Sequence, residues 1–152
     1  MNISEHLTLK EVTKSNEATR AGIDNTPTPE HLTNLITIAE KVFEPLRIHF
    51  AKSIGVSSGY RSKVLNAAVK GSATSQHCFG QALDLDADIF NNGITNSQIF
   101  HWIKDNLVFD QLIWEFGDDK QPAWVHVSYV GNKVNRKKLT RALPGGEYVD
   151  YK

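Results

Sequence analysis

The sequence has only one cysteine, Cys78, so it cannot form an internal disulfide and must rely on its core or on a metal for stability. It has no apolar stretch approaching the roughly 20 residues that a membrane-spanning helix needs. It also has no excess of charge, because 17 lysine and arginine residues balance 17 aspartate and glutamate residues. A neutral chain offers no global field for nucleic acid or an anionic membrane. We therefore expect neither nucleic-acid binding nor membrane insertion.

A secretion signal is also missing. Residues 1–6 contain no basic segment followed by an apolar run, as a Sec-type signal peptide would. We expect a soluble protein that stays in the cytoplasm where it is made. The 152 residues, of which 40% are hydrophobic and 22% charged, suit one globular domain over residues 1–152, with a core of its own.

The first third of the chain carries helix signals. Thr8 and Glu11 form a capping-box pattern, and Thr28 followed by Pro29 is typical of a helix start. Apolar residues then recur at helical spacing, which predicts an amphipathic helix that Pro45 should end or kink.

Strand signals dominate the rest of the chain. We expect strands at 54–57, 82–89, 111–116 and 124–130, the last two as a hairpin. Two further helices are predicted, one capped by Ser62 and running to Val69, and one over 96–106 capped by Thr95 or Asn96. This order predicts an α+β fold with an antiparallel β-sheet and helices packed on one side.

The segment from Ser75 to Asp84 contains the first candidate site. His77 and Asp84 lie seven residues apart, and both imidazole and carboxylate are good zinc ligands. Gly80 between them permits a bend, so a loop histidine and a strand aspartate can meet at one ion. This spacing alone is a weak pattern.

The predicted hairpin supplies the second part. His126 shares a strand face with Trp124 and Ser128, and Glu115 is an acid on an otherwise apolar strand. If the hairpin pairs almost symmetrically about its loop, Glu115 lies opposite or near His126 on the same face. The register itself does not follow from the sequence.

Together these residues make a hydrolytic site. His77, Asp84 and His126 would hold Zn²⁺ and leave its fourth position open for a water, whose pKa zinc lowers towards ~7. Glu115 would take the water's proton and pass it to the leaving amine. Arg61 could pair with a substrate carboxylate or steady an oxyanion, and Ser75 could position the loop or contact substrate.

The ordered combination of these residues resembles a known metal signature. Ser75-x-His77-x-x-Gly80-x-Ala82-x-Asp84, followed by Trp124-x-His126, is similar to that of the zinc D-alanyl-D-alanine carboxypeptidases. Their relatives include D-Ala-D-Ala dipeptidases, phage L-alanyl-D-glutamate endolysins and the hedgehog signalling domain. The turn from Ser58 to Ser62, which contains Arg61, resembles the family's substrate-arginine turn. The resemblance spans residues 54–130 and implies a hedgehog/DD-peptidase-like fold and a zinc peptidase acting on peptidoglycan.

The sequence departs from this family in one position. Many relatives carry the catalytic acid three residues before the second histidine, where this chain has Ala123. Alanine does no acid–base work, so we assign that role to Glu115, as small phage-type members with the acid on the preceding strand suggest.

The expected function is therefore zinc-dependent hydrolysis of peptidoglycan stem peptides or cross-links by a monomeric enzyme. An L-Ala-D-Glu endopeptidase, a D-Ala-diaminopimelate endopeptidase and a D-Ala-D-Ala carboxypeptidase all fit the same residues. Without a signal peptide, the protein would be a phage or prophage endolysin, released to the cell wall by lysis.

Two other classes of function remain open. A zinc-stabilised binding module without turnover would have Glu115 turned away from the metal. A structural zinc domain would need a fourth ligand such as Cys78, although we expect that thiol to be buried as a small apolar group. Asp86 and Asp88, on the same strand face as Asp84, are alternative ligands, hydrogen-bond acceptors for a ligating histidine, or solvated acids.

Overall fold

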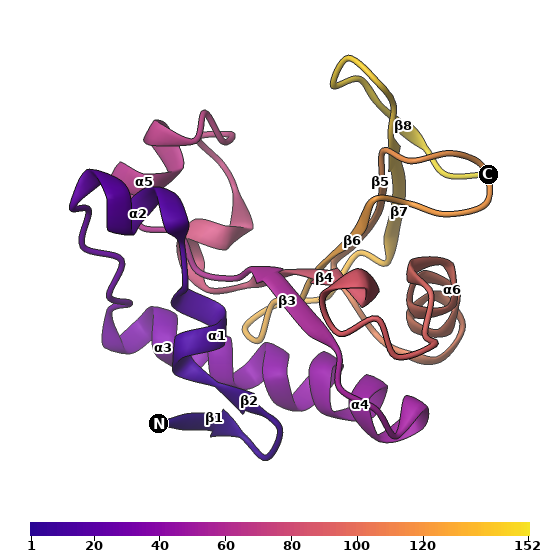
Figure 1. Cartoon of the computed structure of the whole chain (residues 1–152), viewed down its shortest axis with the longest axis horizontal. Coiled ribbons are helices and arrows are strands. Elements are labelled where there is room, and N and C mark those ends of the chain that lie inside the picture. The colour runs from indigo at the N-terminus through magenta and orange to yellow at the C-terminus, as the bar shows by residue number, and fades with distance from the viewer.

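The computed structural model describes residues 1–152 and has an α+β fold, as predicted. A two-stranded sheet lies near the N-terminus, and a six-stranded sheet forms the centre (Figure 1). The strands are β1 (Asn2–Ser4), β2 (Leu7–Thr8), β3 (Gly55–Ser58), β4 (Ala82–Asp86), β5 (Gln111–Glu115), β6 (Trp124–Ser128), β7 (Lys138–Ala142) and β8 (Tyr148–Asp150).

The central sheet has the order β3-β4-β6-β5-β7-β8. All its neighbouring strands are antiparallel except β5 and β7, which run parallel. The sheet, predicted to be antiparallel, is therefore mixed, with one parallel pair among its five strand pairings. Strands β7 and β8 lie in a stretch for which the sequence analysis predicted no strand.

The helical elements begin where capping residues predict them. Thr8 and Thr95 each form a complete capping box, and the Thr28, Ser15 and Ser62 side chains each accept a backbone N–H at a helix start. The elements are α1 (Leu9–Thr13), α2 (Asn16–Ala21), α3 (Pro29–Ile38), η1 (Ala39–Phe43), α4 (Glu44–Phe50), α5 (Lys63–Ala68), η2 (Gln76–Phe79), η3 (Ala87–Ile89) and α6 (Asn96–Asn106). None of the helices has the length and apolar character needed to cross a membrane.

Pro45 does not end the long helix. The chain stays helical from Pro29 to Phe50, but five residues before α4 adopt a π-helical turn. Pro45 lies in the first turn of α4, where its missing N–H removes a hydrogen bond that a regular α-helix would need. The wider π turn accommodates that loss without ending the helix.

The core lies between one face of the central sheet and helices α3, η1, α4 and α6 (Figure 1). Alternate strand residues supply the sheet side of this core: Leu83, Leu85, Leu112, Trp114, Val125 and Val127. Because side chains alternate between faces along a strand, the residues between them point to the other face. That other face carries the polar residues singled out by the sequence.

Strand β4 is shorter than predicted. It ends at Asp86, and the chain turns into the 3-10 helix η3 instead of continuing as a strand to Ile89. Asp86 begins that turn, because its carboxylate accepts the backbone N–H of Asp88 at 3.0 Å. Asp86 therefore has a structural partner, and Asp88 is exposed to solvent.

Candidate metal centre

His77 lies in the short 3-10 helix η2 and is almost fully buried, with 2% of its surface exposed. Ser75 caps this helix, since its hydroxyl accepts the His77 backbone N–H at 3.2 Å. The ring nitrogen Nδ1 lies 2.6 Å from the carbonyl oxygen of Gly59. A carbonyl can only accept, so Nδ1 carries the hydrogen and Nε2 is left for another partner.

That partner is Asp84 on β4, whose Oδ1 lies 3.3 Å from His77 Nε2. If the ring is neutral, its Nε2 lone pair faces a carboxylate oxygen, so two acceptors stand opposite each other. Such an arrangement is stable only with a positive charge between them, either a proton or a metal ion. His77 thus has the orientation of a metal ligand whose other nitrogen is fixed by a backbone carbonyl.

His126 reaches the same carboxylate from β6. Asp84 and His126 are directly paired across the β4–β6 ladder, and His126 Nδ1 lies 3.1 Å from Asp84 Oδ1. Burial alone would raise the pKa of Asp84, but the charge of His77 and hydrogen bonds from both histidines outweigh it. The pKa of Asp84 therefore falls well below its usual value, and the carboxylate is ionised, as a metal ligand must be.

The donor set fits a zinc ion. One ligand atom from each of His77, Asp84 and His126 lies within 4.8 Å of the others. In a tetrahedral site with zinc–ligand distances of about 2.0–2.2 Å, ligand atoms lie about 3.3–3.6 Å apart. The measured separations of 3.1 and 3.3 Å are close to that spacing. Three protein ligands are the usual number for catalytic zinc, which keeps one position open.

Glu115 ends strand β5 and lies on the same sheet face as His126. The register pairs Glu115 with Trp124 and Ile113 with His126, so Glu115 is diagonal to His126 and not directly opposite. Its side chain is buried, with 5% of the residue exposed. The pKa of Glu115 is raised to about 7, mainly by burial; the charge of His126 opposes this rise, and that of Asp84 adds to it. A carboxyl group that titrates near neutral pH suits proton transfer.

Gly80 provides the bend predicted between His77 and Asp84. It ends η2 in the left-handed conformation, with φ of +71°. A Cβ at this position would lie 2.4 Å from the backbone oxygen of His31, so only glycine fits. The bend sends the chain from η2 directly into β4.

Arg61 and Ser75 lie beside the three clustered residues. The guanidinium Nη2 of Arg61 donates to the Ser75 hydroxyl at 3.3 Å, and the Arg61 backbone N–H donates to the His77 carbonyl at 3.1 Å. The Nε of Arg61 is buried and has no hydrogen-bond partner. This cation therefore has unused donor capacity next to the candidate metal centre.

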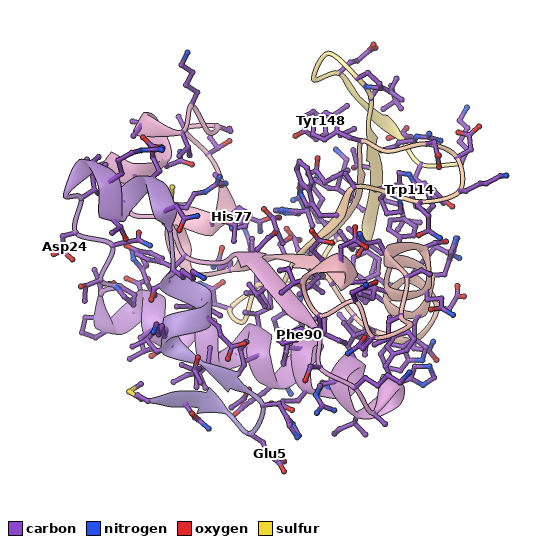
Figure 2. The ribbon with its side chains drawn as sticks, viewed as in Figure 1. Glu5, Asp24, His77, Phe90, Trp114 and Tyr148 are labelled. Carbon is purple, nitrogen blue, oxygen red and sulfur yellow. The ribbon has the colours of Figure 1, made fainter.

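These residues line a cleft of about 1010 Å³ on the polar face of the sheet. In Figure 2, His77 lies at the foot of this cleft, and Tyr148 projects from the opposite wall. The lining includes His77, Asp84, His126, Glu115, Arg61 and Ser75, together with Lys70, Lys133, Arg136 and Tyr148.

Cys78 does not belong to the metal-capable cluster. It is a buried free thiol, and burial raises its pKa. The structure thus agrees with the buried, apolar role expected for this cysteine. Asp86 is also outside the cluster, and its carboxylate accepts hydrogen bonds from Asp88 and Asn96.

Sequence reasoning missed several contributors to the site. The Gly59 carbonyl that orients the His77 ring is a backbone group, and no residue type indicates such a role in advance. Lys133 and Tyr148 line the cleft but lie beyond the hairpin, where no site residue was predicted. The roles of the six predicted site residues remain predictions, although the fold brings all six together around one cleft.

Comparison with protein families gives one match. The family model described as Peptidase M15 matches residues 5–128, which include all six predicted site residues. No curated protein matches the chain.

Proposed function

The chain belongs to the M15 peptidase family, and on that basis we propose that it is a zinc peptidase that cleaves peptides of bacterial peptidoglycan. We assign His77, Asp84 and His126 as the metal ligands and Glu115 as the general base and acid. Arg61 and Ser75 are assigned to substrate binding. The fold class and the family are established; the metal, the substrate and these roles are the proposal.

One observation carries the assignment of a metal. His77 donates from Nδ1 to the Gly59 carbonyl and so directs Nε2 at a carboxylate 3.3 Å away. With a neutral His77 ring this is a buried pair of facing acceptors that needs a cation between them. His126 supplies a third ligand atom to the same point, which supports a metal ion over a lone proton. Zinc bound there would polarise the substrate carbonyl and lower the pKa of a bound water to about 7.

Glu115 is suited to move the proton of the attacking water. It lines the same cleft, shares the sheet face of His126 and is shielded from solvent. Its pKa of about 7, raised by burial, lets the carboxylate accept a proton and release it to the departing amine near neutral pH. This supports turnover over a non-catalytic binding module, in which no such group would be needed.

The cleft also carries cations that suit an anionic peptide. Arg61, Lys70, Lys133 and Arg136 all line it. Arg136 is already paired with the buried carboxylate of Asp110 at 2.8 Å, which leaves the other three for ligands. Peptidoglycan stem peptides carry several free carboxylates, and the planar guanidinium of Arg61 is well suited to bind one of them.

The bond that is cut is a finer part of the proposal. An L-Ala-D-Glu bond, a D-Ala-diaminopimelate cross-link and a terminal D-Ala-D-Ala bond each place a carboxylate near the reacting carbonyl. An endolysin would cut one of the first two, and a carboxypeptidase the third.

Digestion of purified peptidoglycan tests the proposal. Zinc-loaded wild type and Glu115→Gln are incubated with walls of several chemotypes, and the products are identified by mass spectrometry. We expect wild type to release defined peptides, whose masses identify the bond. Glu115→Gln should lose about 10²–10⁴-fold in rate, the usual contribution of general acid–base catalysis, while it still binds zinc.

The controls separate the possible explanations. Glu5→Gln removes the same charge at an exposed position far from the cleft (Figure 2) and should digest walls like wild type. A wild type that binds zinc but cuts no wall would contradict the peptidoglycan assignment. If this inactive wild type nevertheless binds the stem peptide, the alternative of a non-catalytic binding module would replace the peptidase proposal.

A further inference from the structure

Tyr148 lies in the cleft, although it is far from the metal-site residues in sequence and beyond the residues that the family model matches. It begins strand β8, the outermost strand of the central sheet. With 56% of its surface exposed, it is partly open to solvent and partly shielded by the cleft. The Tyr148 hydroxyl has no hydrogen-bond partner within the chain.

The strand register places Tyr148 in line with Glu115. Glu115 on β5 pairs with Ala142 on β7, and Ala142 pairs with Tyr148 on β8. Paired residues in neighbouring strands project from the same face, so Glu115 and Tyr148 both face the cleft. Their strands are separated by only one other strand, so their backbones lie about 10 Å apart.

The residue between them leaves room for contact. Ala142 has only a methyl side chain, so the strand position between Glu115 and Tyr148 carries no large side chain. Charges on Glu115, Asp84 and Arg61 all act on the Tyr148 phenol, and burial together with the two acids raises its pKa. The hydroxyl therefore remains protonated at neutral pH and can donate a hydrogen bond.

The opposite face of the same hairpin provides a contrast. Tyr151 lies three residues further on and stacks against Trp114 on the helix side of the sheet, with ring centroids 5.9 Å apart. Figure 2 shows Tyr148 on the cleft side of the strands and Trp114 on the other side. Tyr151 thus packs against the core, whereas Tyr148 lines the cleft and its hydroxyl donates no hydrogen bond within the chain.

We propose that Tyr148 is a catalytic residue whose hydroxyl donates a hydrogen bond to the carbonyl oxygen of the peptide bond being cut. Arg61 lines the same cleft as Tyr148. As the carbonyl oxygen gains negative charge during attack, a hydrogen bond to it strengthens, so Tyr148 stabilises the transition state more than the bound substrate. This role rests on the peptidase function proposed above.

Kinetics of Tyr148→Phe test this role, with Tyr151→Phe as the matched control. Tyr148→Phe removes only the hydroxyl, and we expect kcat/KM on peptidoglycan fragments to fall about 10- to 100-fold, mostly through kcat. Zinc content and the unfolding midpoint should stay at wild-type values. Tyr151→Phe should keep wild-type kcat/KM, because its ring lies on the other face of the sheet.

A binding measurement gives a second readout that needs no turnover. In a Glu115→Gln background, calorimetry measures the affinity for the stem tetrapeptide L-Ala-γ-D-Glu-diaminopimelyl-D-Ala with and without Tyr148→Phe. The tetrapeptide is used in the linear, cross-linked or D-Ala-extended form that contains the bond identified by digestion. Loss of one neutral hydrogen bond should weaken binding about 2- to 10-fold.

The outcomes distinguish the two proposals. An active wild type with an equally active Tyr148→Phe variant, and unchanged tetrapeptide affinity, would overturn the role of Tyr148 alone. A wild type that neither cuts walls nor binds the tetrapeptide would overturn the peptidase proposal and this role with it.

Discussion

The ring of His77 is oriented by a backbone carbonyl before any ion binds. The Gly59 carbonyl accepts a hydrogen bond from its Nδ1, so Nε2 faces Asp84. Such outer partners set the tautomer of a ligating histidine and typically contribute 10–100-fold to metal affinity. The candidate metal centre therefore includes a carbonyl group as well as three side chains.

At the residue scale, spacing and chemistry predicted much of the candidate site. His77, Asp84 and His126 were selected from their ligand chemistry and order, and they meet within 4.8 Å. Glu115 was selected as an acid on an apolar strand, and it is buried beside them. Its position diagonal to His126 could not be predicted, because strand register depends on the turn and on packing across the whole sheet.

The buried carboxyl of Glu115 makes the stability of the metal-free protein pH-dependent. Its pKa is about 7 in the folded state against 4.5 ordinarily, so folding favours its protonated form. Between these two values the unfolded state releases the proton while the folded state keeps it, and the free energy of unfolding falls as pH rises. Below about pH 4.5 the contribution is fully present, and above pH 7 it is lost.

Glu115→Gln removes this dependence. We expect its free energy of unfolding, relative to wild type, to increase by about 1–3 kcal/mol between pH 5 and pH 8 in the presence of a chelator. Urea denaturation at each pH measures the difference, with Glu5→Gln as the charge-matched exposed control. A difference that stays constant over this range would contradict the burial of an ionisable Glu115.

At the element scale, the site depends on how η2 joins β4. The helix turn presents His77, the strand presents Asp84, and Gly80 makes the sharp change of direction between them. Gly80 sits against the backbone of α3 at His31, so the bend also docks η2 on the long helix. The sequence predicted this bend, because a glycine between two candidate ligands allows conformations closed to other residues.

Gly80→Ala should destabilise the protein more than Gly22→Ala. Both glycines have left-handed φ values, +71° and +67°, so both substitutions carry the same backbone cost of about 1 kcal/mol. A Cβ at Gly80 would also meet the His31 oxygen at 2.4 Å, whereas nothing lies within 4 Å of one at Gly22. We expect Gly80→Ala to cost about 2–4 kcal/mol, since overpacking adds to the backbone term.

Chemical denaturation compares the two variants, and zinc titration reports on the site. Gly80→Ala should also weaken zinc binding, because the bend sets the distance between His77 and Asp84. Equal losses of stability in the two variants, with unchanged zinc affinity, would show that the close approach at Gly80 has no consequence.

Caps and hairpins were predictable elements, and the last two strands were not. Thr8, Thr28 and Thr95 each start a helix as their local pattern indicates, since a cap is a short-range interaction. Strand β7 depends on distant contacts. Arg136 forms an ion pair with the buried Asp110, and the backbone N–H of Lys138 donates to the Asp110 carbonyl. These two contacts place β7 beside β5. Short strands with charged residues, such as β7 and the edge strand β8, give little local signal for such pairing.

At the scale of the whole molecule, one cleft collects residues from distant parts of the chain. Figure 1 shows α5 and the turn after it on one side and the β7–β8 hairpin on the other, with β4 and β6 between them. Arg61 and Lys70 come from the first side, and Tyr148 from the second. Folding alone brings these groups together, so this arrangement of side chains exists only in the native state.

We propose that His77, Asp84 and His126 hold one zinc ion and leave a position open beside Glu115. The decisive experiment is a crystal structure of the zinc-loaded protein, with anomalous scattering measured on both sides of the zinc absorption edge. We expect one strong anomalous peak in the cleft, about 2.0–2.2 Å from one atom of each of the three side chains. No peak at this point, or a peak bound by a fourth protein ligand such as Cys78, would contradict it.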